Sequence, residues 1–326
     1  MAPATRPRVL ATRRWPDDSE RRLDAHFDVV RNDSDVPLSR ADLAAAMREF
    51  DALAPTITDR IDAEMIGQVD RRVQVIGNFG AGFEHIDIAA AKAAGVAVTN
   101  TPGVLTDATA DIALTLLLMA ARRAGEGERE LRGGKWIGWR PTHLLGHALK
   151  GRTLGLVGFG RIGQATAERA HHGFGMKVAY YARREADAEV AGPLDAVWYP
   201  KLDDLLAASD FVSLHVPGGA ETRHLIGAEA FARMQSHAIL INTARGDVVD
   251  EAALVAALRG STIAGAALDV YQGEPNVSQD LIALDNVVLL PHLGSATTET
   301  RNAMGYKVID NLVAWFAGET PPNRIA

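Results

Sequence analysis

The feature that most constrains the fold is a regular alternation of apolar runs and amphipathic helical patterns after Gly151. The strand-like runs are TLGLVG, KVAYYA, DFVSLHV, AILINTA, IAGAALDV and NVVLLP, and patterns such as RIGQATAERAHH and EAALVAALRG lie between most of them. Apolar strands that alternate with amphipathic helices form a parallel sheet covered on both faces. We therefore expect a doubly wound α/β domain in this part of the chain.

The N-terminal third repeats the alternation in shorter runs. Its strand-like runs are RPRVLAT, DALAPTI, RRVQVIGNFG and GVAVTN, separated by helical patterns such as SRADLAAAMREF. The 326 residues suffice for about two domains at roughly 150 residues each. We expect two Rossmann-like doubly wound parallel-sheet domains with a cleft between them. Residues 102–290 would form one domain, and residues 1–101 plus 291–326, including the last helix, would form the other.

The segment between these two regions predicts one buried helix and a loop. The longest apolar run is IALTLLLMAA, within a helical pattern from about Ala108 to Ala124. It is far shorter than the roughly 20 residues that a membrane helix needs. The polar, glycine-rich GEGERELRGGKW that follows is interpreted as a helix end and a loop.

Composition excludes several function classes. Asp and Glu outnumber Lys and Arg by 41 to 34, whereas a nucleic-acid-binding protein normally shows a basic excess. The chain has no cysteine, which excludes disulfides, zinc sites built on Cys and cysteine nucleophiles. The N-terminus has no apolar segment typical of a secretory signal. We expect a cytoplasmic protein with neither a nucleic-acid nor a membrane partner.

A glycine-rich loop directly after the first strand of the regular region indicates a dinucleotide site. Gly158, Gly160 and Gly163 form G-x-G-x-x-G, with Arg161 and Ile162 between the last two. In this context the first Gly permits the tight turn, the second lets a pyrophosphate approach the backbone, and the third lets helix and strand pack closely. The helix N-terminus supplies N–H donors. The alternative is an ordinary glycine-rich strand–helix turn.

The end of the second strand indicates which dinucleotide is preferred. An NAD-binding site places Asp or Glu about 20 residues after the loop, where it contacts the ribose hydroxyls. Here that position holds Arg183 and Arg184, with no acid before Glu185. Two guanidinium groups would attract a 2′-phosphate. We therefore predict that NADP(H) is preferred and that NAD(H) use is possible through Glu185; the alternative is that the arginines belong to a solvated turn.

Three chemically distinct side chains follow strand ends, where ligands of open parallel sheets bind. Arg245 follows AILINTA, Glu274 follows AALDV by a short turn, and His292 follows NVVLLP. Arginine can hold a substrate carboxylate, and histidine can protonate a carbonyl oxygen as a hydride arrives. Glutamate can keep the imidazole oriented and charged. Each residue alone has a structural explanation, but the set of three predicts a catalytic site.

Taken together, the motifs resemble the D-isomer-specific 2-hydroxyacid dehydrogenases, and within them the glyoxylate/hydroxypyruvate reductases. The similarity covers nearly the whole chain, through the segments NFGAGFEHID, TNTPGVLTDATADIALTLLL, GRTLGLVGFGRIGQA, INTARGDVVDE, AALDVYQGEP and LLPHLGSAT. The resemblance implies that Arg245 binds substrate, Glu274 supports the catalytic histidine and His292 donates the proton. It also implies that no metal is required.

Further site residues are carried over from the same resemblance. It implies that the backbone N–H groups of Gly80, Ala81 and Gly82 bind the substrate carboxylate, and that Asp269 contacts the nicotinamide carboxamide. The positions that would line the cofactor are Thr106, Pro217, Thr243 and Gly294. Ile57 would line the substrate pocket. Gly218 and Gly219 depart from the Leu-Thr pair of many relatives, which puts the adenosine-side contacts in doubt.

The resulting functional prediction is an NAD(P)-dependent D-2-hydroxyacid dehydrogenase, an enzyme that reduces glyoxylate or hydroxypyruvate with NADPH. Trp139 matches a tryptophan that such reductases present to the partner's active site, so we expect a homodimer; the alternative is that Trp139 anchors the loop. Two other functions remain open. One is reduction of a bulkier 2-oxo acid such as 2-ketogluconate or hydroxyphenylpyruvate, and the other is a dinucleotide-sensing protein similar to the corepressors of the same superfamily.

Overall fold

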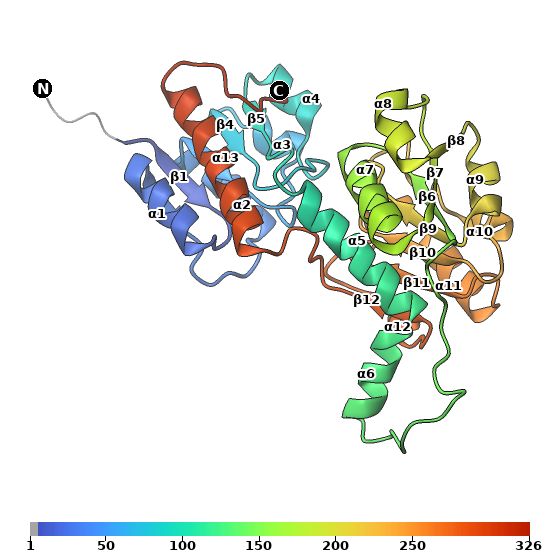
Figure 1. Ribbon diagram of the computed structural model, residues 1–326. Coiled ribbons are helices and arrows are strands. Elements are labelled where there is room, and N and C mark those ends of the chain that lie inside the picture. The colour runs from blue at the N-terminus through green and yellow to red at the C-terminus, as the bar shows by residue number, and fades with distance from the viewer. Residues whose placement is uncertain (1–5) are drawn as a thin grey trace, which may run out of the picture. The chain divides into compact units, whose positions relative to one another are not determined.

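The computed structural model describes residues 6–326, which form two compact units (Figure 1). Unit 1 combines Met1–Leu105 with Ala296–Ala326, and unit 2 is Thr106–Ser295. The predicted divisions, after residues 101 and 290, lie a few residues earlier in the chain. Each unit is built on one all-parallel sheet with helices on both faces, so the predicted pair of doubly wound domains is confirmed. No helix within residues 6–326 has the length and apolar content that a membrane crossing requires.

Unit 1 contains a five-stranded sheet in the order β2-β1-β3-β4-β5. Its elements are β1 (Arg8–Ala11), α1 (Asp17–His26), β2 (Asp28–Arg31), α2 (Arg40–Glu49), β3 (Ala52–Ala54), α3 (Ala63–Ile66), β4 (Val75–Gly77), α4 (Ile88–Ala93), β5 (Ala97–Thr99) and α13 (Thr298–Phe316). Successive strand residues face opposite sides. Val9 therefore packs in one apolar cluster with α1 and α13, while Leu10 packs in another with α2.

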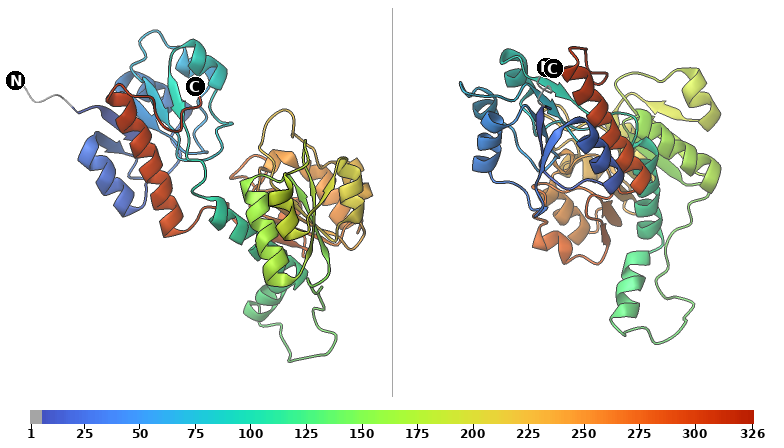
Figure 2. Two further views of the ribbon diagram at one scale, coloured as in Figure 1. Left: turned by 45° about the horizontal axis from the view of Figure 1, so that its top comes forward. Right: turned by 90° about the vertical axis from the view of Figure 1, so that its left-hand side faces the viewer.

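The C-terminal helix α13 completes unit 1 from the far end of the chain. It packs against α1 and β4, and Figure 2 shows α1 and α13 side by side. At Gly77 an added Cβ would lie 2.9 Å from Val308 Cγ1, so the glycine lets α13 approach the sheet closely. Buried Ser19 of α1 donates to the side-chain oxygen of Asn302 at 2.9 Å. The last helix is therefore part of the core of unit 1.

Unit 2 contains a seven-stranded sheet in the order β12-β11-β10-β9-β6-β7-β8. Its elements are α5 (Thr106–Ala121), α6 (Ala124–Arg132), β6 (Thr153–Val157), α7 (Arg161–Glu168), β7 (Lys177–Tyr181), α8 (Ala188–Ala191), β8 (Val197–Tyr199), α9 (Leu202–Ala208), β9 (Phe211–Leu214), α10 (Ala228–Arg233), β10 (Ile239–Asn242), α11 (Glu251–Arg259), β11 (Gly265–Leu268), α12 (Gln279–Ile282) and β12 (Val287–Leu289). The strand order reverses between β6 and β9. Ligands of such sheets bind at this switch point, beyond the carboxyl ends of the strands.

Three elements differ from the sequence-based expectation. The edge strands β2 and β8 were not predicted, because neither has the apolar run of a central strand and both are partly exposed. The helix predicted from about Ala108 to Ala124 is α5, which ends at Ala121, and Arg123 adopts a left-handed conformation with φ 51°. The polar segment predicted as a helix end and a loop holds a separate helix, α6, in which Glu128 pairs with Arg132. Together with the loop that follows, α6 extends away from the rest of unit 2 (Figure 1).

Candidate active site

The G-x-G-x-x-G loop lies at the switch point of unit 2, between β6 and α7. Gly158 has φ 98°, and a Cβ there would lie 2.7 Å from the carbonyl oxygen of His215. A Cβ on Gly163 would lie 2.4 Å from the carbonyl oxygen of Gly158. Both positions therefore require glycine because backbone packs against them. At Gly160, in contrast, an added Cβ would meet no atom within 4 Å.

The open space at Gly160 adjoins the N-terminus of α7, which no side chain caps. Arg161 and Ile162 open this helix, and the N–H groups of a first helical turn have no intrahelical acceptors. Thr243, directly after β10, has a buried hydroxyl without a hydrogen-bond partner among the residues that the structure describes. A phosphate at the helix N-terminus would use the open N–H groups. The residues present thus fit a bound dinucleotide.

Arg183 and Arg184 follow β7, which pairs with β6 beside the glycine-rich loop. Tyr181 pairs with Val157, and the Tyr181 carbonyl accepts a 2.9 Å hydrogen bond from the N–H of Gly158. Both arginines are exposed. The Arg183 guanidinium lies 3.9 Å from the Glu221 carboxylate, which belongs to the loop after β9. Pro217 begins the same loop and is exposed.

His292 and Glu274 form the central pair of the site. His292 Nδ1 lies 2.8 Å from Glu274 Oε2, and the other carboxylate oxygen accepts a 2.9 Å hydrogen bond from the N–H of Tyr271. About a third of the His292 side chain is exposed. Two residues 18 positions apart in the sequence are therefore joined in one polar pair, with the glutamate fixed by backbone on its other side.

The turn that carries His292 is held by Asp269, the residue after β11. The Asp269 carbonyl accepts from the N–H of His292 at 2.9 Å, and its carboxylate accepts from Leu293 at 2.6 Å and Gly294 at 2.8 Å. Three consecutive N–H groups thus converge on one residue. His292 has φ 55°, a strained conformation for a residue with a Cβ. We infer that Asp269 stabilises the backbone conformation that aims the imidazole.

The electrostatics of the pair follow from partial burial. Burial alone raises the pKa of Glu274. The hydrogen bond and charge of His292, the N–H of Tyr271 and the charge of Arg245 outweigh burial, so the pKa of Glu274 lies below its usual value. The pKa of Asp269 lies above its usual value, because the effect of burial exceeds that of the hydrogen bonds that its carboxylate accepts from backbone N–H groups. Glu274 is therefore the group that carries a stable negative charge beside the imidazole.

Arg245 reaches the same edge from β10, and its loop is fixed by close packing. Asn242 donates to the Arg245 carbonyl at 2.9 Å, and the Arg245 guanidinium donates to the Ala244 carbonyl at 2.7 Å. At Gly246 a Cβ would lie 1.9 Å from the carbonyl carbon of Tyr271. The backbone after Arg245 therefore touches the backbone before Glu274. Sequence reasoning missed this contact, although a glycine directly after a candidate catalytic residue was a signal for it.

The loop of Gly80, Ala81 and Gly82 lies in unit 1, after β4. All three carbonyls accept hydrogen bonds: Asn78 donates to Gly80 at 3.1 Å and to Gly82 at 2.7 Å, and Asn100 donates to Ala81 at 2.7 Å. Within residues 6–326, the N–H groups of these three residues have no acceptor. The loop is thus arranged as a set of donors for an anion. The two asparagines were missed, although Asn78 and Asn100 lie within the predicted runs RRVQVIGNFG and GVAVTN and directly follow β4 and β5.

The remaining predicted residues are placed as follows. Ile57 lies beside the loop, because its Cγ2 would be 3.7 Å from a Cβ on Gly80. Thr106 is the first residue of α5. The Gly294 carbonyl accepts a 3.0 Å hydrogen bond from Thr109. Trp139 is 82% exposed in the loop after α6, far more than an anchor beneath that loop would be.

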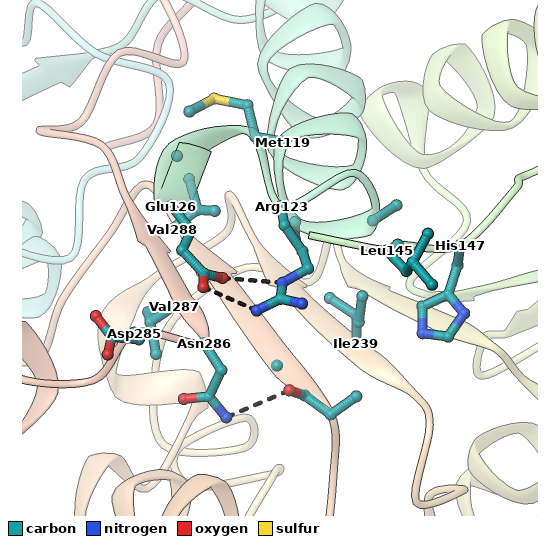
Figure 3. A pocket seen from close by; sticks show the side chains of 16 residues that line it. Met119, Arg123, Glu126, Leu145, His147, Ile239, Asp285, Asn286, Val287 and Val288 are labelled. Carbon is teal, nitrogen blue, oxygen red and sulfur yellow. Dashed lines mark hydrogen bonds and ion pairs between the residues drawn. The ribbon is translucent and has the colours of Figure 1, made fainter. Parts of the chain in front are cut away.

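A cavity of about 420 Å³ lies elsewhere, at the amino ends of the strands of unit 2 (Figure 3). Ile239 and Val287, which begin β10 and β12, line it, and the ion pair of Arg123 and Glu126 forms part of its wall. Glycine-loop residues, Arg245, Glu274 and His292 do not line it. The candidate active site is therefore at the opposite edge of the sheet.

Comparison with known proteins identifies the family. The sequence profile of the D-isomer specific 2-hydroxyacid dehydrogenase NAD binding domain matches residues 114–294. A glyoxylate reductase from Thermococcus litoralis is 45% identical over 98% of this chain and 97% of its own length.

Comparison with solved structures supports the same family. The NADPH-dependent glyoxylate/hydroxypyruvate reductase from Sinorhizobium meliloti, in complex with NADP and malonate, is 38% identical with a TM-score of 0.86, over 99% of this chain and 97% of that one. The D-mandelate dehydrogenase from Rhodotorula graminis is 32% identical with a TM-score of 0.88, over 99% and 98%. With the site geometry, these similarities show that the chain belongs to the D-isomer specific 2-hydroxyacid dehydrogenase family and is an NAD(P)-dependent oxidoreductase acting on CH–OH groups.

Proposed function

We propose that the enzyme reduces glyoxylate and hydroxypyruvate to the corresponding 2-hydroxy acids with NADPH as the preferred cofactor. The observation that carries the proposal is the His292–Glu274 pair, held by Asp269 at the carboxyl ends of β11 and β12. The pair and the dinucleotide-fitting loop both follow the carboxyl ends of strands of the same parallel sheet, an arrangement that suits carbonyl reduction. Similarity to glyoxylate reductases at 45% identity supports the choice of substrate.

In this proposal each residue has one task. A bound nicotinamide dinucleotide supplies the hydride to the carbonyl carbon. His292 gives its proton to the carbonyl oxygen, so that the C=O group becomes CH–OH. Arg245 binds the substrate and polarises its carbonyl, and the N–H groups of Gly80, Ala81 and Gly82 bind the carboxylate. Unit 1 would then be the substrate-binding domain and unit 2 the dinucleotide-binding domain.

The low pKa of Glu274 supports the assignment of His292 as proton donor. An ionised carboxylate 2.8 Å from Nδ1 favours the imidazolium form, which is the form that can give up a proton. It also fixes the ring so that Nε2 is the nitrogen offered to the substrate. After the reduction, the neutral ring regains a proton from solvent through its exposed side.

The preference for NADPH is supported by two exposed arginines shortly after β7, with no acid before Glu185. An arginine fork matches a phosphate group in geometry and charge. Thr106, Pro217, Thr243, Asp269 and Gly294 would line the remainder of the cofactor. The structure of the Sinorhizobium meliloti relative in complex with NADP supports the same class of cofactor.

We further propose a homodimer formed through the segment from α6 to residue 148. Leu131, Trp136, Ile137, Trp139 and Leu145 are all exposed apolar side chains on this segment. Exposed aromatic and aliphatic residues that cluster in this way are typical of a protein interface. A second copy of the chain is the proposed partner, with Trp139 reaching the partner's active site.

The deciding experiment is steady-state oxidation of NADPH and of NADH with glyoxylate, hydroxypyruvate and phenylglyoxylate in parallel. Fast turnover of the two small acids with a preference for NADPH is expected. Turnover restricted to phenylglyoxylate would favour a bulky substrate, as the similarity to a mandelate dehydrogenase allows. His292→Asn should lower kcat by about 10²–10⁴-fold, and retained activity in that variant would contradict its role as proton donor.

A further inference from the structure

The loop after β9 brings a carboxylate close to Arg183, the residue proposed above to bind the 2′-phosphate. β6 lies between β7 and β9 in the sheet, with Val157 paired to Tyr181 on one side and to Leu214 on the other. The segments that leave β7 and β9 therefore flank the start of the glycine-rich loop. Arg183 and Glu221 approach each other from these two sides, with guanidinium and carboxylate 3.9 Å apart.

The backbone around Glu221 is well ordered by local hydrogen bonds. The Thr222 hydroxyl donates to the Pro217 carbonyl at 2.6 Å, and the N–H of Arg223 donates to the Gly219 carbonyl at 3.0 Å. Gly219 has φ 120°, a conformation that disfavours any side chain, and no atom lies within 4 Å of where its Cβ would be. Gly218 and Gly219 add no side chains to this loop, and Glu221 is its acidic residue.

We propose that Glu221 is a second determinant of cofactor choice, which opposes Arg183 and enables the enzyme to use NADH as well as NADPH. In an NAD-binding site, the carboxylate that accepts the ribose hydroxyls stands at the end of the second strand. That strand, β7, ends here in arginines. Glu221 supplies the missing carboxylate from the neighbouring loop, where it accepts a hydrogen bond from the ribose 2′-hydroxyl of NADH.

The same carboxylate opposes NADPH binding. A 2′-phosphate that pairs with Arg183 must displace Glu221 or approach its charge closely, and like charges repel each other. Arg183 and Glu221 are both about nine-tenths exposed, so the effect is modest and salt-sensitive. The inference rests on the proposed function, since it takes Arg183 as the ligand of the 2′-phosphate. The selectivity between NADPH and NADH then depends on the positive charge of Arg183 and the negative charge of Glu221.

The test compares wild type, Glu221→Gln, Arg183→Gln and the control Glu229→Gln, which removes an exposed negative charge on α10. kcat/KM is measured for NADPH and for NADH at saturating glyoxylate in low and high salt. In Glu221→Gln we expect kcat/KM to rise about two- to five-fold for NADPH and to fall by a similar factor for NADH. Salt should reduce the change for NADPH, and the control should change neither value.

The two proposals fail in different ways. Suppose that Arg183→Gln lowers kcat/KM for NADPH but not for NADH, while Glu221→Gln leaves the ratio of the two kcat/KM values unchanged. The role proposed for Glu221 is then wrong, and the proposed 2′-phosphate site at Arg183 stands. If Arg183→Gln leaves NADPH use unaffected, the proposed NADPH site is wrong. Binding of 2′-AMP and 5′-AMP to the unmodified chain and to Glu221→Gln, measured by calorimetry, gives a readout without turnover. If the ratio of the affinities for 2′-AMP and 5′-AMP is the same in the unmodified chain and in Glu221→Gln, the role proposed for Glu221 is also wrong.

Discussion

At the residue scale, the site depends on a few contacts of backbone with side chain. His292 is held in a left-handed conformation by three N–H groups bonded to Asp269, and its ring is held by Glu274. The residues Arg245, Glu274 and His292 were predicted from their positions after strand ends. The supporting contacts were not, because a sequence does not show that Asn78 donates to two loop carbonyls or that Gly246 touches Tyr271.

The Glu274–His292 pair predicts a change in pH dependence. Glu274→Gln removes the ionised carboxylate that lies 2.8 Å from His292 Nδ1, a carboxylate whose pKa is lowered mainly by its hydrogen bond with His292. We expect kcat/KM for glyoxylate reduction to fall about 10²-fold at pH 7.5, and by less at pH 5.5. The measurement is a pH profile of kcat/KM from pH 5 to 9, with Glu189→Gln as an exposed control. An equal loss at every pH would contradict the electrostatic role.

We expect Gly246→Ala, which adds a single methyl group, to lower the activity of the enzyme. A Cβ there would overlap the Tyr271 backbone, so Gly246→Ala must separate the Arg245 loop from the Glu274 loop. A displacement near 1 Å at a catalytic group lowers the rate by about 10²-fold. The control is Gly173→Ala, where no atom lies within 4 Å of the new Cβ. Steady-state kinetics check both variants, and unchanged kinetics in Gly246→Ala would show that the loop contact is dispensable.

At the scale of elements, strands with a buried apolar run were predictable, including the edge strands β5 and β12, and the partly exposed edge strands β2 and β8 were not. All six strand-like runs after Gly151 form strands of the larger sheet, since a strand buried on both faces needs a continuous apolar run. β8 and β2 are edge strands, and their partly exposed residues carry no such pattern. Helix α6 was missed because its charged residues form surface ion pairs, which a hydrophobic pattern does not reveal.

We expect Asp210 to stabilise the larger sheet in a pH-dependent way, because its carboxylate accepts several hydrogen bonds. It accepts hydrogen bonds from Arg152, from the N–H of Thr153 and from His237, and so joins the amino ends of β6, β9 and β10. Burial raises the pKa of Asp210, but these partners outweigh burial and lower it. Asp210→Asn should reduce the free energy of unfolding by about 1–3 kcal/mol at pH 7.

The sign of the pH dependence follows from the lowered pKa. The contribution of Asp210 is fully present above the unfolded pKa of about 3.9 and is lost as the pH falls through the lower folded value. Denaturation of wild type and Asp210→Asn should therefore converge toward acid pH. Asp203→Asn, which breaks an exposed 3.4 Å ion pair with Arg233, should change stability by less than about 1 kcal/mol. A constant difference between wild type and Asp210→Asn at all pH values would contradict this account.

At the scale of the whole molecule, the exposed apolar segment after α6 predicts the oligomeric state. Trp136, Ile137 and Trp139 are 52%, 83% and 82% exposed, so their replacement by serine should leave the fold intact and convert a dimer to a monomer. Light scattering after size exclusion measures the mass, and thermal denaturation checks the fold. Val69→Ser, at a fully exposed position of unit 1, is the control. A monomeric wild type at micromolar concentration would contradict the proposed dimer.

The contribution of α13 to unit 1 has a consequence for synthesis on the ribosome. Unit 2 is one continuous segment, Thr106–Ser295, whereas unit 1 combines residues from before and after that segment. Domains generally fold as units while the chain emerges. Unit 2 can therefore fold once its own segment has emerged, but residues 6–105 must wait with an apolar face exposed until α13 has emerged as well. During this interval the N-terminal segment, although made first, is the part of the nascent chain most in need of a chaperone.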